Sequence, residues 1–277
     1  MKNIRKYLIF LGLGFLIFLG GLFFWQAEKW EGVEEHRSSV IKEETKPFLS
    51  FAVIGDPESD IDNLQRALEK VKEQNLSLAV LVGDLTKYGS DQQFQEVKEV
   101  LEKGEVNYFP LIGNHDLWLT RETGRDIYPQ YFGDRYYSME IEGLQFIFLD
   151  NADQWQGMGQ TQLDWLAEKL RNDAETIIFS HIPFYHPESE KVMDEYSQEL
   201  TSEVEFVLEK ICQKPPLALI SGHIHHTDDY FYLCPEGEKI RMINAGSVNE
   251  TRNWQLPRFL RIDLFKSGDL EIEEVEI

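Results

Sequence analysis

Cysteine is nearly absent from this sequence of 277 residues, which contains only Cys212 and Cys234. Two widely separated cysteines exclude a disulfide-rich scaffold and a CxxC zinc motif. They can form one disulfide if the domain is exported, or they can remain buried free thiols. The sequence leaves these two alternatives open.

Basic residues are also scarce relative to acidic ones. Lys and Arg number 27 against 49 Asp and Glu, so the formal net charge is −22. Such a chain repels the phosphate backbone of nucleic acids, and we therefore expect no nucleic-acid partner. It also repels small phosphorylated ligands unless a cation is held locally in the site. At 42% hydrophobic and 13% aromatic residues the chain is globular, and no feature predicts a partner protein.

The N-terminal segment lacks charge from Tyr7 to Trp25 and follows Lys2, Arg5 and Lys6. About 20 apolar residues span a bilayer, and flanking basic residues stay in the cytoplasm. We predict a single-pass transmembrane signal-anchor at residues 1–25, with the rest of the chain extracytoplasmic. The alternative is a cleaved signal peptide and a secreted protein. Residues 26–47 are polar and predict a linker, followed by one domain over residues 48–277.

Alternating strands and helices begin after the linker. Short β-branched and aromatic runs predict strands, and apolar residues at helical spacing, preceded by cap residues, predict helices between them. The predicted strands are 48–55, 76–83 and 106–113, and the helices are 60–75 and 90–104. This order indicates an α/β fold with parallel strands and right-handed crossovers.

The second half continues the alternation and ends in strands. We predict a hairpin turning at Glu142-Gly143, and a second hairpin around Ser267-Gly268. The elements predicted between the two hairpins are helix 159–172, strand 176–181, a helix near 193–212 and strand 217–222.

Polar residues with ligand atoms follow five of the predicted strands. They are Asp56, Asp84, Asn114 with His115, His181, and His223 with His225. Ligands of open α/β sheets bind beyond the carboxyl ends of the strands. Carboxylate, amide and imidazole donors without thiolates suit Mn²⁺, Fe or Zn²⁺. We therefore predict a metal site, which would also explain why "SGHIHH" holds three of the seven histidines.

The order GD, GD, GNHD, H, GHxH resembles the calcineurin-like metallophosphoesterases, over a stretch from Phe51 to Val248. The resemblance implies a four-layer α/β/β/α sandwich with two divalent metal ions. It implies hydrolysis of a small phosphomonoester or phosphodiester by a metal-bridging hydroxide. His115 would lie near the leaving group and donate a proton to it.

The resemblance also assigns ligands to the two ions. For the first ion they are Asp56, Asp84 and His225, and for the second Asp84, Asn114, His181 and His223, with Asp84 as the bridge. His186 and His226 match no ligand of the family.

Two positions depart from the family pattern. The usual DxH motif is Asp56-Pro57-Glu58, and we predict that Glu58 coordinates the first ion; the alternative is a solvated turn residue. In "GDLTKYG", Lys87 replaces an aspartate that orients the GNH histidine in the family, and it either contacts the substrate phosphate or faces solvent. These departures leave a non-catalytic metal- or phosphate-binding protein as the alternative function.

Overall fold

The computed structural model describes residues 46–195 and 197–277. Residues Leu49–Leu264 with Gly268–Ile277 form one compact unit. The predicted anchor and most of the predicted linker lie outside the described residues. Among the described helices, none has the length and apolar character needed to cross a bilayer.

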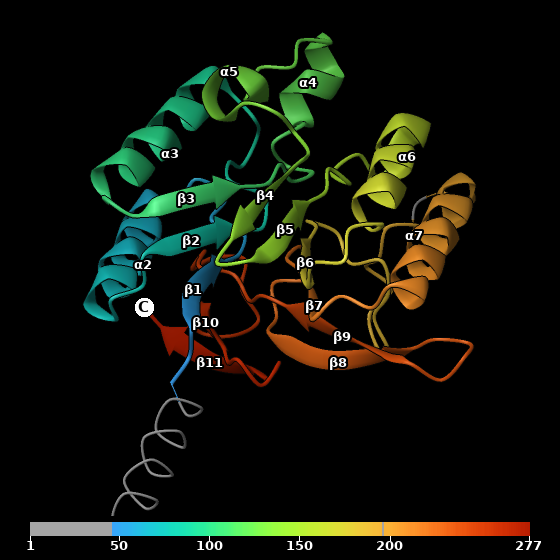
Figure 1. Cartoon of the computed structure of the whole chain (residues 1–277). Coiled ribbons are helices and arrows are strands. Elements are labelled where there is room, and N and C mark those ends of the chain that lie inside the picture. Colours follow the sequence, from blue (N-terminus) through green and yellow to red (C-terminus); the bar gives the residue numbers. More distant parts are fainter. Residues whose placement is uncertain (1–45, 196) are drawn as a thin grey trace, which may run out of the picture. The chain divides into compact units, whose positions relative to one another are not determined.

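The first sheet contains the three strands predicted from the N-terminal half. β1 (Leu49–Ile54), β2 (Leu78–Leu81) and β3 (Asn107–Pro110) run parallel to one another. β10 (Arg258–Leu264) pairs antiparallel with β1, and β11 (Leu270–Glu276) completes the order β11-β10-β1-β2-β3. The last two strands of the chain therefore lie in the same sheet as the first strand, on the side of β1 opposite to β2 (Figure 1).

The second sheet has the order β4-β5-β6-β7-β9-β8. Its strands are β4 (Tyr137–Ile141), β5 (Leu144–Phe148), β6 (Thr176–Phe179), β7 (Ala218–Ser221), β8 (Asp228–Leu233) and β9 (Lys239–Asn244). The four central strands, β5, β6, β7 and β9, are parallel, and the two edge strands are antiparallel to their neighbours.

Phenylalanine side chains join the two sheets face to face. The ring of Phe51 on β1 lies 5.4 Å from that of Phe146 on β5 and 6.2 Å from that of Phe179 on β6. Phe109 on β3 lies 6.2 Å from Phe148 on β5. Aromatic pairs at these distances add favourable contact to the burial of apolar area.

Helices cover the outer faces of both sheets (Figure 1). α2 (Ile61–Glu73) and α3 (Asp91–Lys103) share an apolar core with β1 and β2, and α6 (Gly159–Lys169) and α7 (Thr201–Gln213) share another with β5, β6 and β7. β1 and β2 are thus buried on both faces, with helices on one side and the other sheet on the other. This double burial explains the continuous apolar runs in the sequence.

The α/β class and both predicted hairpins are confirmed, with β4–β5 and β10–β11 turning where expected. The helix expected near 193–212 begins later, at Thr201, after a 3₁₀ turn at Gln198–Leu200. The sequence did not predict α4 (Trp118–Thr123) or α5 (Tyr128–Phe132), because helices this short show no apolar period.

The two cysteines form a disulfide. Cys212 near the end of α7 is bonded to Cys234 just after β8, with Cα atoms 5.7 Å apart. The bond ties a helix on the outer face of the second sheet to the edge strand of that sheet. Of the two alternatives that the sequence left open, the structure has the disulfide.

Candidate metal centre

The predicted ligand residues meet where the carboxyl ends of strands from both sheets converge. Asp56 follows β1, Asp84 follows β2 and Asn114 follows β3, while His181 follows β6, and His223 and His225 follow β7. Three groups of side chains place their ligand atoms within 4.8 Å of one another. They are Asp84 with His181 and His223, Asp56 with Asp84 and His225, and Glu58 with Asp84 and His115.

Asp84 is the member common to all three groups. Its side chain is almost fully buried, and its Oδ1 lies 3.3 Å from Nε2 of His181. The same oxygen accepts a hydrogen bond from the backbone N–H of His115. Burial alone would raise the pKa of Asp84, but the neighbouring histidine charges, chiefly that of His181, hold it well below its usual range. A buried, ionised carboxylate at the middle of the cluster can be shared by two cations.

Left-handed backbone conformations recur at this site. Five of the seven predicted metal ligands have positive φ, although none is glycine: Asp56 (45°), Glu58 (42°), Asp84 (47°), His223 (70°) and His225 (60°). Each such residue costs about 1–3 kcal/mol and persists only where the surrounding structure enforces it. These left-handed turns direct the side chains from the strand ends back into one cluster.

Glycines in the GD and GN motifs permit close approach of the loops. A Cβ atom on Gly83 would stand 2.4 Å from Nδ1 of His181, and one on Gly113 would stand 2.0 Å from the backbone nitrogen of Asp84. Real Cβ atoms do not tolerate either distance. The glycines of these two motifs are therefore required for the packing of the site as well as for the turns.

The ring of His181 directs its Nε2 at two oxygen atoms. Its Nδ1 donates to the carbonyl of Val82 at 2.8 Å, and its Nε2 lies 2.9 Å from Oδ1 of Asn114 and 3.3 Å from Oδ1 of Asp84. A neutral ring in this orientation needs a cation between its Nε2 and the two oxygens. Burial lowers the pKa of His181, but the charge of Asp84 outweighs it and raises that pKa to about 9 in the metal-free protein. The proton on Nε2 therefore occupies the position that a metal ion would take.

His225 and Glu58 form a similar arrangement on the other side of Asp84. Nδ1 of His225 donates to the backbone carbonyl of Arg252, which leaves Nε2 facing Oε1 of Glu58 at 3.4 Å and Oδ1 of Asp56 at 3.7 Å. Burial lowers the pKa of His225 to about 4, so the ring is neutral at pH 7. Burial raises the pKa of both Asp56 and Glu58. A cation would relieve each of these costs.

Glu58 has one oxygen left over for a cation. Oε2 accepts a hydrogen bond from Nη1 of Arg252 at 2.9 Å. Oε1 is buried and has no well-aligned hydrogen bond within the described part of the chain, although Nη1 of Arg252 lies 2.8 Å away. This orphaned oxygen and the two imidazole lone pairs fit a divalent metal, and the solvated-turn alternative does not match a side chain that is 1% exposed.

His115 lies beside this cluster and is held at both ring nitrogens. A carbonyl can only accept and a guanidinium can only donate. Nδ1 therefore donates to the carbonyl of Lys87 at 2.9 Å, and Nε2 accepts from Nη1 of Arg252 at 3.0 Å. The backbone of Lys87 thus performs the orienting contact that the family pattern assigns to an aspartate side chain. The Lys87 ammonium itself lies 5.3 Å from the centre of the Tyr88 ring.

Three supporting residues were not identified from the sequence. Asp116 is fully buried and accepts hydrogen bonds from the loops that carry Asp84 and Asn114, and burial together with the charge of Asp84 raises its pKa to about 7. Asn151 accepts from the backbone of His181, and Arg252 contacts Glu58 and His115. Asp116 is the last residue of the GNHD motif, so the motif could have been used to identify it.

The two unassigned histidines lie outside the cluster. Nδ1 of His186 accepts hydrogen bonds from the backbone of Glu188 and Ser189, and Nε2 lies 3.2 Å from Asp228. His226 contacts the Gln255 side chain. His186 therefore has a structural role in its own loop, and neither residue belongs to the three ligand groups.

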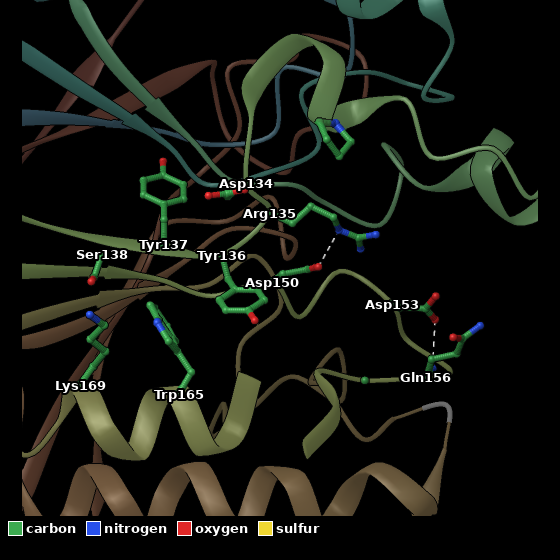
Figure 2. A pocket seen from close by; sticks show the side chains of 12 residues that line it. Asp134, Arg135, Tyr136, Tyr137, Ser138, Asp150, Asp153, Gln156, Trp165 and Lys169 are labelled. Carbon is green, nitrogen blue, oxygen red and sulfur yellow. Dashed lines mark hydrogen bonds and ion pairs between the residues drawn. The ribbon is translucent and has the colours of Figure 1, made fainter. Parts of the chain in front are cut away.

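A cavity of about 450 Å³ opens over the cluster. It is lined by Asp84, Asn114, His115, Gln154, Lys191, His223, His225, Thr251, Arg252, Asn253 and Trp254. A larger cavity, of about 840 Å³, lies around Arg135 and is lined by none of the predicted ligands (Figure 2). The Arg135 guanidinium there is already paired with Asp150 at 2.7 Å and Asp126 at 3.1 Å. The smaller cavity is therefore the one that brings a ligand to the cluster.

Comparison with known proteins agrees with this geometry. The calcineurin-like phosphoesterase family matches residues 49–227. A protein named probable cyclic nucleotide phosphodiesterase from Fibrobacter succinogenes is 32% identical over 189 residues, covering 64% of this chain and 71% of that protein. The mouse serine/threonine-protein phosphatase CPPED1 is 29% identical over 58% of each chain.

Solved structures show the same fold at low sequence identity. A dimetal phosphatase from Danio rerio has a TM-score of 0.63 and 18% identity, covering 83% of this chain and 98% of its own. A purple acid phosphatase from yellow lupin has a TM-score of 0.58 and 13% identity, covering 82% of this chain and 51% of its own. At these identities the similarity concerns the fold alone.

Proposed function

Because this chain belongs to the calcineurin-like phosphoesterase family and is a phosphoester hydrolase, we propose that it hydrolyses a small phosphoester at a dinuclear metal centre outside the cytoplasm. The first ion would be held by Asp56, Glu58, Asp84 and His225. The second ion would be held by Asp84, Asn114, His181 and His223.

The observation that carries this proposal is the sharing of Asp84. Two imidazole–carboxylate groups, one with Asp56 and His225 and one with His181 and His223, overlap only in that residue. A single-ion site needs one such group, whereas two overlapping groups suit two ions with a bridging carboxylate. The donor set contains only oxygen and nitrogen, which favours Mn²⁺, Fe or Zn²⁺.

The side chains divide the chemical tasks between them. When bound, the two divalent ions supply Lewis acidity and a nucleophile from water at neutral pH. His181 and His225 fix the positions of their ligand nitrogens by donating Nδ1–H to backbone carbonyls. His115 stands at the cavity and protonates the departing oxygen, for which it must carry a proton on Nε2 in place of the Arg252 contact.

Two features support a location outside the cytoplasm. The disulfide between Cys212 and Cys234 is of a kind that persists in oxidising compartments. The uncharged segment Tyr7–Trp25 after three basic residues favours a membrane anchor with the domain on the far side. Fractionation of cells that express the full chain tests this: we expect the protein in the membrane pellet, and soluble protein beginning near Glu28 would contradict the anchor.

The names of the relatives point to different phosphoesters. Besides those described above, a protein named probable glycerophosphodiester phosphodiesterase GpdQ, from Arcobacter nitrofigilis, is 25% identical over 61% of this chain. A panel of p-nitrophenyl phosphate, bis-p-nitrophenyl phosphate and glycerophosphodiesters therefore separates monoesterase from diesterase activity.

The decisive experiment compares Asp84→Asn with the unchanged protein. Metal content should fall from about two ions per chain to fewer than one, and hydrolysis of the whole panel should be lost. Asp164→Asn, on the exposed side of α6, is the matched control and should retain both. Full metal content in Asp84→Asn would contradict the shared ligand, and bound metal without turnover in the unchanged protein would favour a binding function.

A further inference from the structure

Arg252 reaches into the site from a loop beyond the family match, which ends at residue 227. Its Nη1 lies 2.8 and 2.9 Å from the two oxygens of Glu58 and 3.0 Å from Nε2 of His115. Its backbone carbonyl accepts from Nδ1 of His225. Arg252 therefore contacts His225 with its main chain, and Glu58 and His115 with its side chain. His225 and Glu58 are both predicted ligands of the first ion.

The loop that carries Arg252 is held by its own hydrogen bonds. Asn249 Oδ1 accepts from the backbone N–H groups of Thr251 and Arg252, and Asn249 Nδ2 donates to the carbonyl of Pro57. Asn253 Nδ2 donates to the carbonyl of Ser247. The loop is thereby fastened to the turn that carries Glu58, so the guanidinium group has a defined position.

The Nε–Nη2 edge of the guanidinium group remains available. Arg252 carries five N–H donors, and Nη1 supplies the contacts to Glu58 and His115. Over the described residues, no protein acceptor forms a hydrogen bond with Nε or Nη2, and the side chain is 47% exposed where it lines the cavity. The Nε–Nη2 edge of arginine is a fork that matches two oxygens of a phosphoryl group.

The charge of the site favours this use. Asp56, Glu58 and Asp84 bring three carboxylates to a chain whose net charge is −22. The cationic side chains that line the cavity are Arg252 and Lys191. A cationic side chain at the cavity adds to the attraction that bound metal ions would exert on an anionic ester.

We infer that Arg252 is a substrate-binding residue that holds the phosphoryl group of the ester through its Nε–Nη2 edge, and that Glu58 is the residue that positions it. Glu58 then has two functions: Oε1 faces the metal cluster, and Oε2 fixes the arginine. This accounts for a carboxylate at a position where the family carries histidine, because a carboxylate has two oxygens for the two tasks, whereas a neutral imidazole has a single lone pair. The inference rests on the proposed function and adds to it the residue that recognises the anion.

The test measures binding of inorganic phosphate to the Mn²⁺-loaded full-length protein by calorimetry, alongside metal content and hydrolysis of bis-p-nitrophenyl phosphate. We expect Arg252→Ala to retain its metal, to bind phosphate at least tenfold more weakly and to raise KM. Arg252→Lys should recover part of the phosphate affinity. Arg66→Ala removes an arginine on α2 that does not line the cavity and should change nothing.

The role of Glu58 is tested by a double-mutant cycle. Glu58→Gln should weaken phosphate binding when Arg252 is present and have little further effect in the Arg252→Ala background. An equal loss in both backgrounds would show that Glu58 acts through the metal alone and would overturn its positioning role.

Two outcomes would overturn the role of Arg252. One is unchanged phosphate affinity in Arg252→Ala, and the other is loss of metal from that variant, which would make Arg252 a support of the metal site. The proposed function fails separately: if the unchanged protein binds phosphate through Arg252 but hydrolyses no phosphoester on the panel, the function is wrong and the binding inference stands.

Discussion

Replacing Asn151 by alanine tests how the loop after β5 supports the candidate metal centre. The side chain is fully buried; Oδ1 accepts from the backbone N–H groups of His181 and Ile182, both at 3.0 Å, and Nδ2 donates to the carbonyl of Ile182 at 2.6 Å. Alanine leaves the two buried N–H groups without this partner, whereas the carbonyl of Ile182 keeps its hydrogen bond from the Ser180 hydroxyl. Each unsatisfied group costs about 1–3 kcal/mol, so we expect a loss of about 2–6 kcal/mol in the free energy of unfolding.

The same substitution should loosen His181. Its backbone nitrogen loses the partner that holds it, and supports of metal ligands are typically worth 10–100-fold in metal affinity. We therefore expect Asn151→Ala to bind the second Mn²⁺ at least tenfold more weakly, while the first is less affected because its ligands do not contact Asn151.

The assay is urea denaturation of the metal-free protein followed by circular dichroism, together with a Mn²⁺ titration of the folded protein. Asn172→Ala is the matched control, since that exposed side chain accepts one hydrogen bond at 3.3 Å within its own loop. It should change the unfolding free energy by less than about 0.5 kcal/mol. If Asn151→Ala unfolds within about 1 kcal/mol of the unchanged protein and binds both ions normally, the argument from buried hydrogen bonds is refuted.

Three further predictions concern other parts of the molecule. His115→Ala should keep both metal ions and lower kcat by about 10²–10⁴-fold for esters with poor leaving groups, but less for p-nitrophenyl esters; equal losses on both would argue against proton donation. Replacing Cys212 and Cys234 together by serine should lower the free energy of unfolding by about 3 kcal/mol, because the disulfide joins residues 22 apart; an unchanged melting temperature in calorimetry would contradict this. Because the pKa of His181 is raised to about 9 in the metal-free protein, the ring carries a proton at pH 7 that a metal ion must displace. Affinity for the second ion should thus increase about tenfold per pH unit up to pH 9, and calorimetry in buffers of different ionisation enthalpy should detect about one proton released per chain at pH 7.

The parts of the site that the sequence predicts are those attached to strand ends. Asp56, Asp84 and His181 could be anticipated because a buried strand that ends in a polar residue places it at a known edge of the sheet. The arrangement in two stacked sheets came only from the resemblance to a family, and the order of the strands within each sheet was not predicted, since local apolar patterns do not say which strands pair.

Other features depended on tertiary structure. Arg252 lies 194 residues from Glu58 along the chain, and nothing in "ETRNW" distinguishes it from a surface arginine. The left-handed backbone at His223 and His225 is enforced by surrounding contacts rather than by residue type, because histidine has no general preference for positive φ comparable to that of glycine. The pairing of the cysteines required the distance between their Cα atoms.

The pairing of β1 with β10 has a consequence for biogenesis. Leu49 lies opposite Leu264 and Val53 opposite Leu260. One edge of β1 therefore stays unpaired until a strand more than 200 residues later in the chain has been synthesised. At about 5–20 residues per second, translation leaves that edge uncovered for roughly 10–40 s. A chain in this state exposes an apolar strand to aggregation, and such long-range pairing also folds slowly. Folding of the first sheet is therefore completed only after β10 has been synthesised, so the metal ligand that follows β1 can be held in its final place only at that late stage.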